Sequence, residues 1–151
     1  MVVDIASFVP RGKSTKWLIK MDYLREISRR GRDANPFFQL MGIEIGTYGN
    51  GEAELNMLVR PDMHNGVGWL QGGLFTALCD EAMALALFTV LQEGTAIATI
   101  SESTSFLQGV RSGRITARAR VVKKGRRVAF MEGSVKSEDG MLLTETRASF
   151  A

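Results

Sequence analysis

Residues 72–91 read GGLFTALCDEAMALALFTVL, and this stretch decides the fold. Its side chains are apolar all around a helix, with four exceptions: Thr76, Asp80, Glu81 and Thr89. A helix that is apolar all round lies in a protein interior or in a membrane. Twenty residues of helix span about 30 Å, which is enough to cross a bilayer. Two adjacent carboxylates at the middle would be costly in lipid, so we expect a buried helix and no membrane span.

Short segments with the patterns of strands flank this helix. Residues 41–47 and 52–59 are separated by Tyr-Gly-Asn-Gly, whose Asn-Gly pair tolerates the positive φ angles of a hairpin turn. Along residues 114–121 polar and apolar side chains alternate, which is typical of a sheet with one wet face. We predict further strands at 95–107, 114–122, 128–135 and 141–150, arranged as an antiparallel meander. The predicted fold class is therefore α+β, with a long central helix wrapped by a curved antiparallel sheet of about six strands.

The first 35 residues form a basic extension, with eight basic and four acidic residues and a net charge of +4. Residues 15–30 place apolar side chains at helical spacing, so one amphipathic helix is predicted, with Ser14 or Thr15 as its cap and Gly31 at its end. Such an arm could meet nucleic acid, an anionic membrane or a phosphorylated ligand, or simply be solvated. Nucleic-acid binding is not expected, because a helix-turn-helix needs at least two helices. We predict an extension at 1–35 and the main domain at 36–151.

Composition excludes several classes of protein. The chain has 151 residues, of which 45% are hydrophobic and 23% charged, which suits one globular domain. The single cysteine, Cys79, excludes an internal disulfide, and one histidine, His64, is too few for a typical catalytic zinc site, so no metal is expected. The N-terminus lacks an apolar run followed by a small-residue cleavage site, so the expected location is the cytoplasm.

Two features of the central helix indicate chemistry. Asp80 and Glu81 lie about 100° apart around the helix, so they face different surroundings, and one can serve chemistry while the other serves structure. The helix begins at Gln71-Gly72-Gly73, where free backbone amides and small residues would suit a carbonyl oxygen that gains negative charge. The alternative is that the two glycines only make a tight turn into the helix.

Residues 64–80, HNGVGWLQGGLFTALCD, resemble the Asn, Gly, His-Gly-Gly, Leu-Ala-Asp signature of hotdog-fold acyl-CoA thioesterases of the PaaI-like subgroup. Gly125-Arg126-Arg127 and Asp139-Gly140 resemble two hairpins of that subgroup. The resemblance implies a hotdog fold whose paired subunits form a continuous sheet, in a homodimer or a homotetramer. It also implies hydrolysis of an acyl-CoA thioester without a cofactor, because CoA is part of the substrate.

The resemblance assigns roles to particular residues. It implies that Asp80 is the nucleophile or general base, that the Gly72 amide polarises the thioester carbonyl, and that Asn65 helps to order the site. Thr99 lies nearest the position of a Ser or Thr that holds the carboxylate or water, with Ser101 and Ser103 as alternatives. Gln71 stands where the motif has His, and an amide cannot become charged near neutral pH.

Distance indicates a site shared by two subunits. Gly72 and Asp80 are eight residues apart on one helix, or about 12 Å at the usual rise. An oxyanion donor and an attacking group must both lie near the same carbonyl, so these two residues must come from different chains if both act. We therefore expect an obligate homodimer.

Because CoA carries phosphates, we expect basic residues near the site that binds it. Our candidates are Lys124, Arg126 and Arg127 in one turn and Arg111 near another, although these can equally be solvated turn charges. The main alternative function is a non-catalytic acyl-CoA-binding or sensor protein of the same fold, which the Gln71 replacement leaves open. A hotdog hydratase is disfavoured, because no His follows Asp80 within a few residues.

Overall fold

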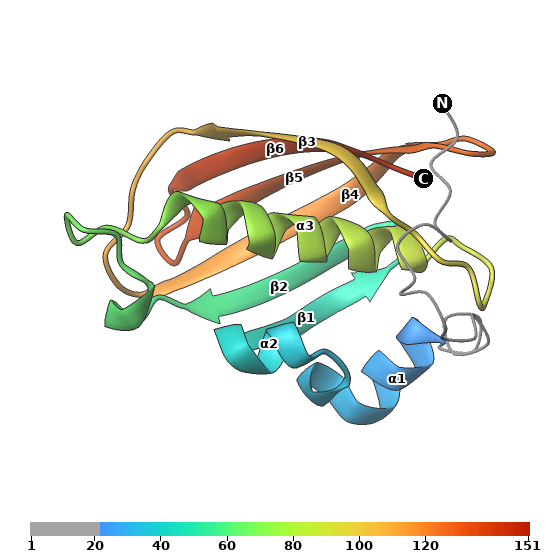
Figure 1. The fold of residues 1–151 in the computed structure, drawn as a ribbon, viewed down its shortest axis with the longest axis horizontal. Coiled ribbons are helices and arrows are strands. Elements are labelled where there is room, and N and C mark those ends of the chain that lie inside the picture. Colours follow the sequence, from blue (N-terminus) through green and yellow to red (C-terminus); the bar gives the residue numbers. More distant parts are fainter. Residues whose placement is uncertain (1–21) are drawn as a thin grey trace, which may run out of the picture.

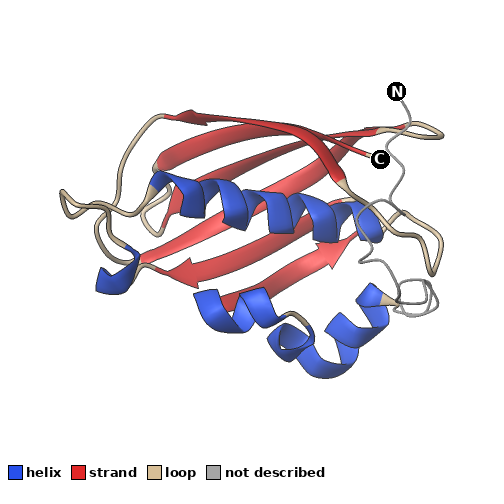
Figure 2. Cartoon of the chain, in the orientation of Figure 1, coloured by secondary structure: helices blue, strands red, loops and turns tan. Residues whose placement is uncertain are grey.

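The computed structural model describes residues 22–151 and has one sheet with a long helix packed on it. The helix α3 lies across one face of the six strands (Figures 1 and 2). The helical elements are α1 (Tyr23–Arg30), a 3-10 turn (Gly31–Ala34), α2 (Pro36–Met41), a second 3-10 turn (Pro61–Met63) and α3 (Gly72–Phe88). The strands are β1 (Ile43–Gly49), β2 (Glu52–Leu58), β3 (Thr99–Phe106), β4 (Arg114–Lys124), β5 (Ala129–Ser137) and β6 (Leu142–Phe150). This arrangement confirms the predicted fold class.

The strand order is β1-β2-β4-β5-β6-β3, with antiparallel pairing between neighbours. The predicted meander is therefore correct for β4, β5 and β6 but wrong for β3. That strand pairs with β6 at one edge of the sheet, and β4 pairs with β2 instead. The alternation of polar and apolar residues shows which face of a strand is buried, but it does not show which strand lies beside it.

The core lies between α3 and the sheet. Leu78, Met83 and Leu85 of α3 are at most 1% exposed, and they share one cluster with Leu55 and Ile115 of the sheet. Burying each such side chain stabilises the fold by about 1.5–3 kcal/mol. The helix ends at Phe88, three residues before the end of the apolar run. Within residues 22–151, no helix is both long enough and apolar enough to cross a membrane.

Two local predictions can be compared with the structure. At the turn between β1 and β2, Asn50 has φ 52° and Gly51 has φ 82°, which confirms the positive φ angles expected there. The N-terminal helix ends at Gly31 as predicted, but it begins at Tyr23, because the Asp22 side chain caps it by accepting from the Arg25 amide. The expected caps Ser14 and Thr15, and the helix over residues 15–21, lie outside the described residues.

The N-terminal helix α1 packs on the same core as the rest of the chain. Ile27 is 2% exposed and belongs to the core cluster. The ring of Tyr23 lies 5.0 Å, between centroids, from that of Phe88 at the end of α3. These contacts hold α1 near the C-terminal half of α3, and Figure 1 shows the two helices in these positions.

Candidate active site

The strand β3 and the helix α3 meet along a polar seam that contains Asp80. The Thr99 hydroxyl donates a hydrogen bond to Asp80 Oδ1 at 3.0 Å. Asp80 is half-buried, and this burial raises the pKa of its carboxyl, while the hydrogen bond from Thr99 lowers it. The structure therefore brings together two of the residues singled out in the sequence, an acid and the hydroxyl that orients it.

A bulge in β3 adds a third residue to this seam, Glu102. In the pairing with β6, Thr99 lies opposite Phe150 and Glu102 lies opposite Ala148, and the register shifts at Ile100. Phe150 and Ala148 are both buried on the inner face of the sheet. Residues three apart on a regular strand face opposite sides, so the bulge is what turns both Thr99 and Glu102 towards α3.

The environment of Glu102 is unusual for a carboxylate. Its Oε1 atom is buried and has no hydrogen-bond partner among residues 22–151. Burial and, secondly, the charge of Asp80 raise the pKa of Glu102 to about 7. Sequence analysis missed this residue, because an isolated Glu in a polar segment gives no signal until the bulge shows which way it faces.

Glu81 faces a different environment from Asp80. Its Oε2 atom accepts a hydrogen bond from Asn35 Nδ2 at 3.1 Å, and the same amide group also donates to the Tyr23 hydroxyl at 3.1 Å. Burial, followed by the charge of Asp80, raises the pKa of Glu81 to about 7. The two adjacent acids are thus separated, with Asp80 beside β3 and Glu81 beside the segment that joins α1 to α2.

The N-terminus of α3 carries the amide expected to polarise a carbonyl. Gln71 is the N-cap, and its side-chain Oε1 accepts from the Gly72 amide at 3.1 Å. A Cβ at position 72 would lie 3.3 Å from the Phe106 ring, so the glycine allows this ring to approach the backbone. Gln71, which stands where the motif has His, therefore accepts from the Gly72 amide, the donor that the resemblance assigns to a substrate oxygen.

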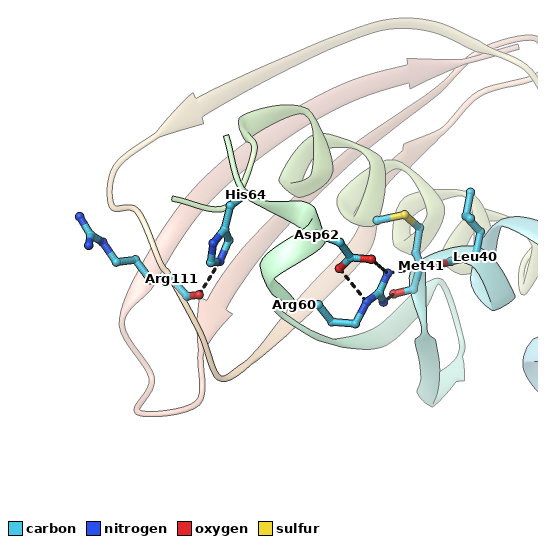
Figure 3. Close-up of polar contacts among 6 residues, drawn as sticks. All are labelled: Leu40, Met41, Arg60, Asp62, His64 and Arg111. Atoms are coloured by element: carbon cyan, nitrogen blue, oxygen red, sulfur yellow. Dashed lines mark hydrogen bonds and ion pairs between the residues drawn. The ribbon is translucent and has the colours of Figure 1, made fainter. Parts of the chain in front are cut away.

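The loop before α3 is held by Asn65 and His64. Asn65 Oδ1 accepts from the amides of Val67 and Trp69, each at 3.1 Å, so this side chain orders the turn that leads to Gln71. The His64 ring contacts the Arg111 carbonyl oxygen at 2.7 Å, as Figure 3 shows. This contact gives His64 a structural partner.

Arg60 connects this loop region to α2. Its guanidinium donates to the Met41 carbonyl at 2.9 Å and pairs with the Asp62 carboxylate at 3.1 Å (Figure 3). The contacts join the end of α2 to the segment after β2, and so help to fix the path of the chain towards α3.

The expected CoA-binding cations fall into two groups in one chain. The Arg111 guanidinium lies 4.2 Å from the Trp69 ring centroid, near the start of β4. Lys124 ends β4, and Arg126 and Arg127 follow it, all of them exposed. Because β4 has 11 residues, the two groups are about 35 Å apart. The two residues that the resemblance assigns to the reaction are also separated within one chain, because Gly72 and Asp80 lie about two turns apart on α3.

A separate hollow of about 690 Å³ is lined by charged side chains of the sheet. Two ion pairs cross it, Arg118 with Glu54 at 2.8 Å and Arg120 with Glu132 at 2.5 Å. These residues alternate along their strands with buried residues that face α3, so they lie on the other face of the sheet. We therefore place the candidate active site at the α3–β3 seam, where the acids are.

Known proteins share this fold and sequence pattern. A profile of the thioesterase superfamily matches residues 68–144. A Haemophilus influenzae protein classed as a candidate esterase is 30% identical over 111 residues, which cover 74% of this chain and 80% of the relative. The 1,4-dihydroxy-2-naphthoyl-CoA hydrolase of Listeria monocytogenes is 23% identical over 113 residues, or 75% of this chain and 92% of the relative.

Solved structures agree with this result. A mutant of the phenylacetic acid degradation protein PaaI from Thermus thermophilus superposes with a TM-score of 0.71 and 29% identity, over 77% of this chain and 97% of that one. The chain therefore belongs to the thioesterase superfamily. It has the hotdog fold and is a thioester hydrolase, which confirms the resemblance to PaaI-like thioesterases.

Proposed function

We propose that this protein hydrolyses acyl-CoA thioesters at a site that two subunits share, with Asp80 as the acting carboxylate. The observation that carries the proposal is the hydrogen bond from Thr99 to Asp80, which orients a half-buried acid at the middle of the central helix. Asp80 either attacks the thioester carbonyl or takes a proton from the attacking water. The Gly72 amide stabilises the oxyanion that forms in either case.

The second subunit supplies the oxyanion donor. Gly72 and Asp80 lie about 12 Å apart along α3, so one chain cannot bring both to the same carbonyl. β3 lies at an edge of the sheet, and its outward side chains Ser101, Ser103 and Ser105 are exposed. An unpaired edge can add the equivalent strand of a second copy, which supports a homodimer. A homotetramer is a further expectation.

Gln71 acts as a removable cap in this scheme. Its Oε1 atom accepts from the Gly72 amide, so a substrate oxygen must displace that side chain before the amide can bind it. The amide cannot supply the positive charge that an imidazolium could. Gln71 therefore caps the start of α3, and Asp80 and Gly72 carry out the chemistry.

CoA and the acyl group occupy different surroundings. We assign the CoA phosphates to Arg111 or to the turn with Lys124, Arg126 and Arg127, which carry exposed positive charges. Phe106, next to Gly72, packs edge-to-face on Phe75 at 6.4 Å between centroids. This aromatic wall suits an apolar or aromatic acyl group. The name of the Listeria relative specifies such a group, 1,4-dihydroxy-2-naphthoyl.

The test is a substrate panel with detection of free thiol. Acetyl-, hexanoyl-, palmitoyl-, benzoyl- and phenylacetyl-CoA are offered to the wild type and to the Asp80→Asn and Gln71→His variants. We expect wild-type turnover, loss of turnover in Asp80→Asn with the fold and CoA binding retained, and retained turnover in Gln71→His. Glu81→Gln is the matched control, with a smaller effect on chemistry because Glu81 faces Asn35.

Three results would change the proposal. Near-normal turnover in Asp80→Asn would remove this acid from the mechanism. Tight binding of an acyl-CoA without release of thiol would favour the alternative, a sensor protein. A catalytically active monomer in analytical ultracentrifugation would exclude the shared site.

A further inference from the structure

Glu102 lies between two contacts that join β3 to α3. At one end of the strand, Thr99 is hydrogen-bonded to Asp80. Towards the other end, the Thr76 hydroxyl donates to Thr104 Oγ1 at 3.2 Å. Thr76 and Asp80 are one helical turn apart, so the half-buried Glu102 lies beside the turn that ends at Asp80. The inner face of β3 thus presents a second carboxyl to the same part of the helix.

The surroundings of Glu102 favour its protonated form. Among residues 22–151, nothing donates a hydrogen bond to its buried Oε1 atom. The groups of α3 that interact with it electrostatically are Asp80 and Cys79, and neither is a cation. On β6, Glu145 and Arg147 lie opposite residues of the outer face of β3, so their side chains point away from Glu102. A carboxyl in these surroundings is more stable with a proton, because burial and a neighbouring acid both oppose a second negative charge.

A protonated acid beside a carboxylate is the arrangement that thioester cleavage can use. The departing group is an alkyl thiolate, whose conjugate acid has a pKa near that of Cys, about 8.5. Breaking the C–S bond is easier when sulfur receives a proton at the same time. General acid catalysis of this kind typically contributes about 10²–10⁴-fold.

We propose that Glu102 is the general acid of the reaction and gives its proton to the sulfur of the departing CoA; this rests on the proposed role of Asp80. In the water route, Asp80 takes a proton from water as the water oxygen bonds to the carbonyl carbon. The tetrahedral oxyanion then re-forms the C=O bond, the C–S electron pair moves to sulfur, and sulfur takes the proton of Glu102. The proton held by Asp80 passes to Glu102, which restores both groups.

The same assignment holds if Asp80 attacks directly. The C–S bond then breaks as an anhydride forms between the acyl group and Asp80, and sulfur takes the proton of Glu102. Water cleaves the anhydride by adding its oxygen to the acyl carbon, which frees the Asp80 carboxylate. One proton of that water returns to Glu102, and the other remains on the product acid.

The test uses leaving groups of different basicity. The acyl group hydrolysed fastest in the substrate panel is offered as its CoA thioester and as its thiophenyl ester, whose aryl thiolate leaves without needing a proton. We expect Glu102→Gln to lower kcat for the CoA ester by about 10²-fold and kcat for the thiophenyl ester by less than about threefold. The matched control is Glu145→Gln, on β6, which should leave both rates unchanged.

Each alternative result overturns the inference. An equal loss with both esters would mean that Glu102 has a structural role, and unchanged rates would mean that it has no role. Failure of Asp80→Asn to lose activity would overturn the proposed function itself, so the two failures are distinguishable.

A second measurement on the wild type does not depend on the folding of a variant. Because Glu102 must hold a proton, kcat for the CoA ester should fall as the pH rises through about 7, the pKa of this carboxyl. The thiophenyl ester should lack this alkaline decline. The same decline with both esters, or with neither, would contradict the assignment.

Discussion

Replacing Thr99 with Val should shift the acid limb of the pH profile upwards. The variant keeps the shape of the side chain but removes the hydroxyl that donates to Asp80 Oδ1 at 3.0 Å. That hydrogen bond lowers the pKa of Asp80, against the raising effect of burial. In the proposed mechanism Asp80 acts in its ionised form, so activity is present above its pKa and is lost as the pH falls through it. Without the donor the pKa rises, so the loss begins at a higher pH.

The size of the shift follows from the strength of the hydrogen bond. A hydrogen bond to a charged group contributes about 1.5–3 kcal/mol, and Thr99 is exposed, so water competes and the lower end applies. About 1.4 kcal/mol corresponds to roughly one pKa unit. We therefore expect the acid limb of kcat/KM to move up by about one pH unit, with little change above pH 8.

The assay is kcat/KM for the best acyl-CoA of the panel, measured by thiol release between pH 4 and pH 9. Thr99→Ser is the control, because it keeps the hydroxyl and should keep the wild-type acid limb. An unshifted limb in Thr99→Val, or an equal shift in both variants, would show that the hydroxyl does not set the ionisation of Asp80.

Three further variants test the surroundings of the site. Glu81→Gln should raise the free energy of unfolding by about 2 kcal/mol at pH 8 and much less at pH 4. Folding raises the pKa of Glu81 from 4.5 to about 7, so the ionised carboxyl of the wild type lowers the free energy of unfolding as the pH rises through that window. The measurement is urea titration at both pH values, and equal effects of the substitution at the two would contradict this. Gly133→Ala should lower the free energy of unfolding by about 1–2 kcal/mol, because the new methyl group would clash with the Cys79 sulfur. Adding Cys79→Ala should recover part of this stability, measured by thermal unfolding, whereas strictly additive effects of the two substitutions would argue against the contact. Reversing Arg126 and Arg127 to Glu should raise KM for acyl-CoA about tenfold with little change in kcat, whereas an unchanged KM would indicate solvated turn charges.

The α3–β3 seam explains how two adjacent acids come to lie in different environments. Asp80 accepts a hydrogen bond from the exposed Thr99 on the edge strand β3, whereas Glu81 accepts one from Asn35, in the segment between α1 and α2. The 100° step between neighbouring helix residues makes this separation possible. Elements distant in the chain, β3 and the segment before α2, decide which environment each acid receives.

Much of the fold is readable in local patterns. The apolar run of α3 predicts burial because its composition leaves no polar face, and Asn50-Gly51 predicts a hairpin because these residues tolerate positive φ angles. The motif around Gly72 and Asp80 likewise indicates the family, because the spacing of its residues can be compared directly with that of known proteins. Such features depend on neighbours within a few residues.

The position of β3 and the role of Glu102 depend on contacts between distant segments. Alternation along a strand does not specify its partner, so β3 could be placed beside β6 only by the folded sheet. The bulge at Ile100 depends on that pairing, and it alone turns Glu102 towards Asp80. Amino-acid order thus indicated the elements and the family, while tertiary packing selected which acids meet, because long-range strand register is not encoded in any local period.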